Sequence, residues 1–213
     1  MQAPEARLFL GTRLAWSVGL AGFWALGYFM AGVWLHPAPV FNPSTALDAA
    51  IPFTGLALWP YLSGIVWMGM PAVLLQSPAL FRHTAYSYAL LIAISILCFV
   101  LVPAEAPQLR AQASGAGLDP LTAWALLHLH AIDPPRNLLP SLHVSLAALA
   151  ACALARSDVR WRLPAALVLA TIVASVCLSK QHTVADAAAG LLAAWLCDGL
   201  ARRFSPAPRP PPR

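Results

Sequence analysis

Long stretches without a single charged residue are the feature that most limits what this chain can fold into. Leu14 to Leu35 carries no charge, and residues 49–81 form a longer run that is also uncharged. A helix needs roughly 20 mostly apolar residues to cross the hydrocarbon core of a bilayer. Only 10% of the residues are charged, whereas ordinary soluble domains have about 25%. These runs predict an integral membrane protein.

The apolar runs predict an all-α bundle of six membrane crossings, built as a single domain over residues 1–203. A polar, proline-rich interval, residues 103–140, separates the third crossing from the fourth. The short segment "LDAAIPF", residues 47–53, predicts a re-entry before the second crossing, and the Pro/Arg-rich residues 204–213 predict a disordered cytoplasmic tail. The six expected crossings cover residues 14–35, 56–75, 84–102, 141–155, 163–179 and 183–200.

The basic residues predict which way these crossings face. Of the thirteen Lys and Arg residues, only Arg110, Arg136 and Lys180 fall on one side of the expected topology. The richer side should be cytoplasmic, and an even number of crossings puts both termini there, in an inner or plasma membrane. The three exceptions therefore lie on the periplasmic or outer side, where they serve something other than topology.

Composition also limits the possible partners. The net charge of +5 does not predict a nucleic-acid partner, because no basic stripe is interleaved with aromatic residues. The cysteines lie inside apolar segments, without CxxC or histidine-paired spacing, so neither a disulfide framework nor a zinc site is expected. We therefore predict no metal and no cofactor. The cysteines are Cys98, Cys152, Cys177 and Cys197.

His182 and Asp186 open the last crossing. Residues four apart lie on one face of a helix. A carboxylate that binds one ring nitrogen of a histidine fixes the tautomer and leaves the other nitrogen bare. That nitrogen can take a proton, bind a metal or attack an electrophile, but the same pair could also simply satisfy itself at a helix end.

A second polar group, Ser141 and His143, opens the fourth crossing. Ser141 follows a proline and can cap the helix, whose free N–H groups favour an anion. Lys180 precedes the last crossing, and Arg110 and Arg136 lie in the interval before Ser141. The non-cytoplasmic rim is thus expected to hold two imidazoles, a carboxylate and several cations.

This set of groups favours phosphoryl transfer through a covalent phosphohistidine. Positioned cations and N–H donors stabilise the charge that spreads over the phosphoryl oxygens in the transition state. One imidazole can attack phosphorus while a second protonates the departing oxygen.

The other histidines receive no functional role. His128 and His130, two residues apart, point different ways on a helix and are expected to be surface or interface residues. His36 and His83 lie at crossing ends, and Asp198 with Arg202 forms a pair at helical spacing.

The two motifs resemble those of the type 2 phosphatidic acid phosphatase superfamily. Its broad pattern is K-x6-R-P, then P-S-G-H, then S-R-x5-H-x3-D. This chain has "PSLH" at Pro140 to His143 and "SVCLSKQHTVAD" at Ser175 to Asp186. Together with "LDAAIPF" and Gly190, they are similar in particular to the branch of inositol phosphorylceramide synthases. The resemblance covers roughly residues 47–195 and implies a haloperoxidase-like helical core.

The resemblance implies a role for each matching residue. It makes His182 the nucleophile, Asp186 its orienting partner, His143 the acid toward the leaving group, and Ser141 a phosphate ligand. The family's glycine in the second motif is Leu142 here.

The larger departure from the family pattern is the loss of its conserved-motif basic residues. The arginine of the third motif is Val176, and the chain has no K-x6-R-P motif. Lys180, Arg110 and Arg136 are our candidates to bind phosphate in place of the missing residues.

The leading hypothesis is a lipid phosphatase that hydrolyses the phosphate or pyrophosphate headgroup of a lipid at the outer leaflet. The candidate substrates are phosphatidic acid, phosphatidylglycerol phosphate and an isoprenyl phosphate or pyrophosphate. A phosphotransferase that delivers the phospho-headgroup to a lipid alcohol would need the same residues, so it stays open. A non-catalytic transporter or channel is the third possibility. The sequence predicts no oligomeric state.

Overall fold

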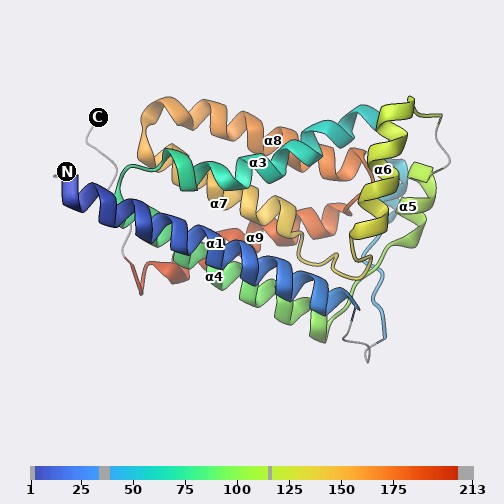
Figure 1. Ribbon diagram of the computed structural model, residues 1–213. Helices are drawn as coiled ribbons and strands as arrows, with labels where there is room; N and C mark the ends of the chain where they lie inside the picture. Colours follow the sequence, from blue (N-terminus) through green and yellow to red (C-terminus); the bar gives the residue numbers. More distant parts are fainter. Residues whose placement is uncertain (1–2, 34–38, 115–116, 206–213) are drawn as a thin grey trace.

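A computed structural model describes residues 3–33, 39–114 and 117–205. Long helices form the body of the molecule, and short ones connect them at the two ends (Figure 1). No β-strand occurs in these ranges, so the all-helical prediction is confirmed. The helices are α1 (Ala3–Val33), α2 (Ala46–Ala50), η1 (Gly55–Ala57), α3 (Leu58–Leu74), α4 (Pro78–Leu101), α5 (Pro107–Ser114), α6 (Pro120–Ile132), α7 (Leu142–Ser157), η2 (Val159–Trp161), α8 (Arg162–Leu178) and α9 (Val184–Ala201).

Helix α7 forms the centre of the bundle. It packs against α3, α4, α8 and α9, and most of its side chains are buried. Small residues make this position possible, because its sequence "LAALAACALA" lets neighbouring helices approach closely. Helix α1 lies at the edge of the bundle, mainly against α4. The two helices that carry the histidine motifs, α7 and α9, are thus direct neighbours.

Five helical segments are long and apolar enough to span a membrane: 9–32, 55–74, 78–101, 159–178 and 184–201. They match five of the six predicted crossings. The remaining crossing corresponds to α7, which is apolar but shorter, at 16 residues.

Two helices begin earlier than the predicted crossings. Helix α4 begins at Pro78 rather than at residue 84, because the Ser77 side chain accepts a hydrogen bond from Leu80 N and Pro78 occupies the first turn. Helix α1 begins at Ala3, and its segment that is apolar enough to cross a membrane is 9–32, compared with the predicted 14–35.

The polar interval between the third and fourth predicted crossings contains two helices. Helices α5 and α6 lie across one end of the bundle (Figure 1). Asp119 caps α6 by accepting hydrogen bonds from Leu121 N and Thr122 N. The segment predicted to re-enter the membrane forms α2, which lies at this end too, followed by the short turn η1. We call this end the rim.

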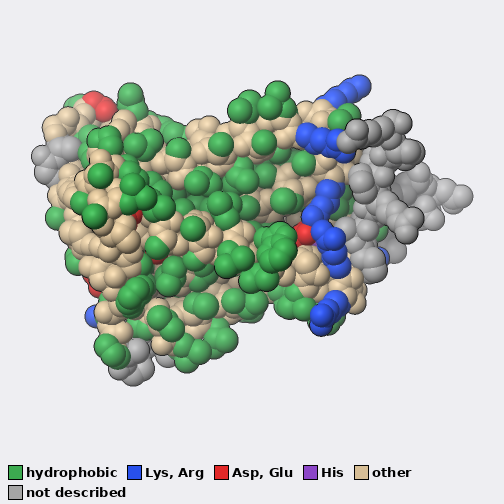
Figure 2. Space-filling view, turned by 180° about the vertical axis from the view of Figure 1, so that it is seen from behind, with side chains coloured by type: hydrophobic (Ala, Val, Ile, Leu, Met, Phe, Trp, Pro, Cys, Tyr) green, Lys and Arg blue, Asp and Glu red, His purple; other side chains and the backbone are tan. Residues whose placement is uncertain are grey.

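On the face that Figure 2 shows, the basic side chains gather at the opposite end. Arg82 lies in the first turns of α4, Arg156 in the last turn of α7, and Arg202 follows α9. Two residues of the predicted tail, Phe204 and Ser205, belong to this end, and Ser205 is buried. Residues 206–213 and His36 lie outside the described residues.

Candidate active site

A cavity of about 350 Å³ lies among α1, α3, α4 and α7 and reaches the rim. Its walls are mainly apolar, with contributions such as Leu20, Ile65 and Ile92. His143 and His182, the histidines of the two sequence motifs, both line it. Helix α7 and the turn before α9 therefore present two imidazoles to one space.

His182 lies in the turn before α9, and Asp186 lies in its first turn. The Thr183 hydroxyl accepts a hydrogen bond from Asp186 N at 3.1 Å, and the Asp186 carboxylate accepts one from Thr183 N at 2.8 Å. This capping box holds the carboxylate in place. Nδ1 of His182 lies 3.6 Å from Oδ2 of Asp186, which leaves Nε2 of His182 as the ring nitrogen available for reaction.

The position of His143 depends on α3. Its Nε2 lies 2.6 Å from the carbonyl oxygen of Tyr61, and its ring stacks on the Tyr61 ring at 4.1 Å. Since a carbonyl can only accept, Nε2 carries the hydrogen and Nδ1 is the nitrogen that can exchange a proton. A Cβ at Gly64 would lie 2.4 Å from His143 Nε2, so only glycine leaves room for this ring.

The first turns of α7 and α9 are held together at Ser141 and Gly190. Ser141 caps α7 by accepting from Val144 N at 3.3 Å, and its own N–H donates to Asp186 O at 3.2 Å. A Cβ at Gly190 would lie 2.7 Å from Ser141 O. The predicted phosphate ligand Ser141 is fully buried, and it positions the two motifs relative to each other.

Lys180 is buried, with a positive φ of 58°. Its ammonium group donates to the carbonyl oxygens of Asp48 and Ile51 in the α2 segment, the first at 2.6 Å. The predicted role as a phosphate ligand stays a prediction. The observed contacts instead connect the α2 segment to the turn that carries His182.

Asp48 is a residue that sequence reasoning missed, although the motif "LDAAIPF" contains it. Its Oδ1 accepts from Val184 N at 2.7 Å, and its Oδ2 accepts from Thr45 N at 2.7 Å. Burial raises the pKa of Asp48, but these hydrogen bonds outweigh it and hold the pKa below its ordinary value. Asp48 therefore stays ionised and stabilises the N-terminus of α9.

The two loop arginines each contact a rim carboxylate. Arg110 Nη2 donates to Asp133 Oδ2 at 2.7 Å, and Arg136 Nε lies 3.8 Å from Glu105 Oε2. Both arginines also have further interactions. Their predicted contact with phosphate stays a prediction.

Three polar residues that the sequence did not single out also line the cavity: Tyr28, Asp133 and Asn137. Tyr28 OH donates to Asp133 Oδ1 at 2.6 Å, and Asn137 Nδ2 donates to Tyr28 O at 2.6 Å. Tyr28 lies inside an apolar crossing and Asp133 before two prolines, so only the tertiary fold brings them to the histidines.

His130, predicted to be a surface or interface residue, is half-buried and lies 3.3 Å from Gln181 Nε2 through its own Nε2. Burial, and next the charge of Arg110, lower the pKa of His130. It therefore serves as a neutral contact between α6 and the His182 turn.

A comparison with protein families explains why these residues occur together. The model of the PAP2 superfamily matches residues 33–198, which include both histidine motifs. The chain belongs to the PAP2 superfamily. This membership confirms the resemblance to the superfamily, without distinguishing its branches, and indicates a phosphatase- or phosphotransferase-type activity. Neither the curated proteins nor the solved structures gave a match.

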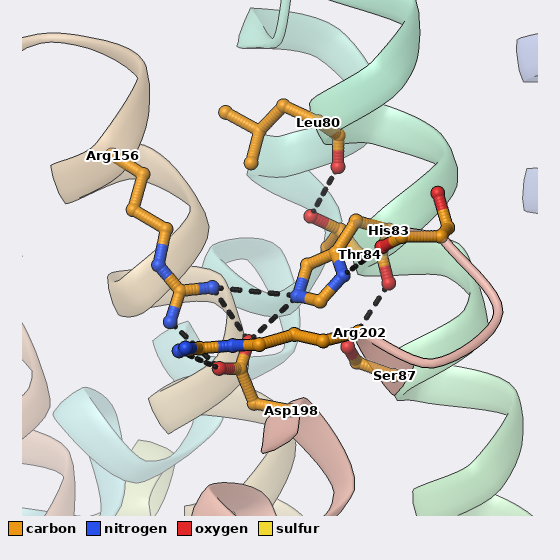
Figure 3. Close-up of polar contacts among 8 residues, drawn as sticks. Leu80, His83, Thr84, Ser87, Arg156, Asp198 and Arg202 are labelled. Atoms are coloured by element: carbon orange, nitrogen blue, oxygen red, sulfur yellow. Dashed lines mark hydrogen bonds and ion pairs between the residues drawn. The ribbon is translucent and has the colours of Figure 1, made fainter. Parts of the chain in front are cut away.

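A second histidine–aspartate pair lies at the opposite end of this PAP2 protein (Figure 3). His83 Nε2 lies 3.0 Å from Asp198 Oδ1, and His83 Nδ1 lies 2.8 Å from Ser205 O. Arg156 binds both oxygens of Asp198 at 2.6 Å, and Arg202 adds a contact at 3.3 Å. The sequence predicted only the helical Asp198–Arg202 pair.

Proposed function

We propose that this PAP2 protein is a membrane lipid phosphatase that removes a phosphate or pyrophosphate headgroup through a phosphohistidine on His182. The observation that carries the proposal is the shared cavity: both motif histidines line a space whose walls are apolar. A lipid tail can occupy such a space while its phosphate meets the imidazoles. A soluble phosphate ester would gain nothing from these walls.

In the first half-reaction, Nε2 of His182 attacks phosphorus and the bond from phosphorus to the lipid oxygen breaks. The Asp186 carboxylate, 3.6 Å from Nδ1, stabilises the positive charge that the ring gains. Protonated His143 gives the proton on Nδ1 to the departing lipid oxygen. The products are a phosphohistidine and a lipid alcohol. With a pyrophosphate headgroup, the departing oxygen belongs to a lipid monophosphate instead.

In the second half-reaction, water attacks the phosphohistidine. His143, now neutral, takes a proton from the water through Nδ1, while its Nε2–H stays bound to Tyr61 O. The bond from phosphorus to nitrogen breaks, and its electron pair returns to His182. Phosphate leaves, and His143 is again protonated for the next cycle.

We also propose that all six long helices, α7 included, cross an inner or plasma membrane, with the rim facing the periplasm or exterior. The basic end of the bundle, which includes Arg82, Arg156 and Arg202, supports a cytoplasmic placement of that end (Figure 2). Helix α1 begins at the same end. The active site would then meet lipid headgroups of the outer leaflet.

A phosphotransferase is the second candidate, and the motif spacing that resembles inositol phosphorylceramide synthases favours it. The same histidines would pass the phosphoryl group, or a phospho-headgroup, to a lipid alcohol instead of water. The polar residues Asp133 and Asn137 beside the histidines support this candidate. A transporter or channel would use the cavity without turnover.

The test is a phosphoenzyme assay on the purified full chain in detergent. The protein is incubated with phosphatidic acid, phosphatidylglycerol phosphate and an isoprenyl pyrophosphate, each labelled with ³²P. It is then quenched in alkali, in which phosphohistidine is stable and acyl phosphates are not. We expect alkali-stable, acid-labile label on the chain and release of free phosphate.

Vanadate, which adopts the geometry of the five-coordinate phosphorus, should block both the labelling and the release. A chain that binds these lipids but gives neither label nor product would exclude the enzymatic proposal and leave the transporter. Phosphate release without a labelled intermediate would exclude the phosphohistidine.

A further inference from the structure

The cavity that holds the two histidines extends far beyond them, and the hydrolysis proposed above uses only its rim end. On each of three helices, the lining residues nearest the rim and nearest the basic end are 11 or 12 positions apart. These residues are Tyr61 and Ala72 on α3, Ile92 and Phe81 on α4, and Phe29 and Ser17 on α1. At a rise of about 1.5 Å per residue, the cavity follows each helix for about 16–18 Å. This length is about half of the roughly 30 Å hydrocarbon core of a bilayer, which is the depth of one leaflet.

The cavity opens sideways between α1 and α3. These two helices pack mainly on other partners, α1 on α4 and α3 on α7 and α8. Ala21, Ile65 and Gly69 line the cavity and are nevertheless exposed, Ile65 by 59%. In the proposed topology this opening faces the bilayer. A lipid can therefore enter from the side, with one chain in the cavity and any second chain outside it.

Arg13 lies directly beyond the far end of the cavity. It precedes Ser17, the lining residue of α1 nearest the basic end, by about one helical turn. Its Nε donates to Ala72 O at 3.0 Å, and its Nη2 donates to Val73 O at 2.7 Å. The guanidinium carbon lies 5.9 Å from the centre of the Phe81 ring. This one side chain thus joins α1, α3 and α4 where the cavity ends.

A hydrocarbon chain cannot replace the contacts that Arg13 makes. The carbonyl groups of Ala72 and Val73 belong to the last turn of α3, where carbonyls have no partner within the helix. Arg13 supplies the missing donors. A chain that displaced the guanidinium would leave these carbonyls and the Arg13 N–H groups unpaired in apolar surroundings, which is costly. Arg13 therefore sets a firm end to the space that a chain can occupy.

We propose that Arg13 determines the chain length that this protein prefers, by ending a channel that runs from the histidines between α1 and α3. The inference rests on the proposed function, which places the phosphate at His143 and His182. A trans hydrocarbon chain advances by about 1.3 Å per carbon, because its bonds of about 1.5 Å zigzag at the tetrahedral angle. About 13 carbons then reach the end of the channel. Further carbons must bend out through the side opening and gain no contact.

The test compares chain-length preferences between variants. The purified full chain hydrolyses octyl, dodecyl and hexadecyl phosphate in the same detergent micelles, and kcat/KM for each longer chain is divided by that for octyl phosphate. Dividing the ratio of a variant by that of the wild type cancels the partition of each substrate into the detergent. The comparison then reports the channel alone.

Farnesyl and geranylgeranyl phosphate extend the test to branched chains, because their main chains have as many carbons as dodecyl and hexadecyl phosphate. The series with the higher kcat/KM identifies the type of chain that the protein uses. The order of the variants should be the same in both series, since the length of the channel does not depend on branching.

Gly69→Leu should shorten the channel. Gly69 lies eight residues after Tyr61 on α3, so the new side chain would lie about 12 Å along the channel. An octyl chain ends before this point and a dodecyl chain passes it. The dodecyl and hexadecyl ratios should fall by about tenfold or more. Gly19→Leu is the matched control, because an added Cβ meets nothing within 4 Å at either glycine and only Gly69 lines the cavity. Its ratios should equal those of the wild type.

Two variants test the far end. Ser17→Leu should lower the hexadecyl ratio by about tenfold and leave the dodecyl ratio within about twofold, because only the longer chain reaches this position. Arg13→Met keeps an apolar side chain but removes the guanidinium. It should raise the ratio of eicosyl to dodecyl phosphate by about threefold or more, because the channel no longer ends at α3. If Arg13→Met does not fold, Ser17→Leu still tests the position of the end.

The possible failures are separable. Phosphate release with wild-type ratios in both Gly69→Leu and Ser17→Leu would refute the channel while the proposed function stands. A folded Arg13→Met protein with an unchanged eicosyl preference would refute the role of Arg13. If no chain length is hydrolysed, the proposed function fails. Binding of octyl and hexadecyl phosphonate, which cannot be hydrolysed, then tests the channel in the same variants, and equal affinity ratios in all of them would refute it as well.

Discussion

The molecule places a histidine–aspartate pair at each end of the same helix α9, and the two pairs are built differently. At the basic end, both ring nitrogens of His83 have oxygen acceptors, and Asp198 binds two arginines. At the rim, the His182 ring and Asp186 are 3.6 Å apart. Among the described residues, His182 Nδ1 and Asp186 Oδ1 have no hydrogen-bond partner.

This difference separates structural from chemical use of the same residue types. When every group of a buried ion pair is satisfied, removal of one partner destabilises the fold, and no atom of the pair is left to bind a substrate. A pair with unsatisfied groups, in contact with a cavity, can improve its interactions when a substrate arrives. Burial alone would not distinguish them, since both pairs are nearly inaccessible.

The largest contrast should come from removing the two histidines. His182→Ala should lower phosphate release from phosphatidic acid by roughly 10⁴-fold or more, because the nucleophile is lost. His83→Ala should leave the rate per folded molecule unchanged and lower the free energy of unfolding by about 1–3 kcal/mol, because Ser205 O and Asp198 lose a donor. Steady-state kinetics and thermal unfolding in detergent measure these two effects. If His182→Ala were fully active, His182 would not be the nucleophile.

Substitution of the two aspartates should separate turnover from stability, as substitution of the two histidines does. Asp186→Asn should slow turnover by roughly 10²- to 10⁴-fold, because the amide cannot stabilise the positive ring of His182. Asp198→Asn should instead destabilise the fold by about 3 kcal/mol, because Arg156 loses its bidentate partner. The assay compares kcat with the thermal midpoint of each variant. A large loss of kcat in a well-folded Asp198→Asn protein would remove the distinction between the two ends.

The sequence contained the two motifs but not the surroundings that complete the site. "PSLH" and "KQHTVAD" predicted the two histidines and the aspartate, because local spacing and helix starts are visible in one segment. Tyr28, Tyr61 and Asp133 reach the cavity only because α1, α3 and α6 pack around it. Such contacts join distant segments and leave no pattern in a single sequence.

The helical fold was predicted more completely than its connections, for a related reason. Apolar runs in the sequence indicate the long helices directly. The Ser77 cap and Pro78 place the start of α4 before the predicted crossing. Lys180 shows what the spacing of charges leaves out: it was predicted as a phosphate ligand, and the two backbone carbonyls to which its ammonium group donates were not predicted. The identity of a hydrogen-bond partner depends on the backbone path, which the spacing of charged residues does not reveal.

Lys180→Met tests what this lysine does for the rim pair. If it positions the His182 turn, kcat should fall by about tenfold while KM stays within about twofold, since two hydrogen bonds to the α2 segment are lost. Asp48→Asn, on the other side of the same connection, should have a similar effect through the Val184 N–H. A rise in KM and in the vanadate inhibition constant, with kcat unchanged and only in Lys180→Met, would instead identify Lys180 as a phosphate ligand.

The smallest expected effect concerns the spacing of the two motif helices. In Gly190→Ala, the added methyl group would lie 2.7 Å from Ser141 O, so α7 and α9 must separate at the rim. Activity should fall by a few-fold to about tenfold, and stability by about 1–3 kcal/mol, as is typical of overpacking. Gly199→Ala is the matched control on the same helix, because nothing lies within 4 Å of its added methyl group. Equal activity in the two variants would mean that the separation of Ser141 and Asp186 does not limit the reaction. The functional difference between the two ends of α9 would then depend only on the charged groups of the two histidine–aspartate pairs.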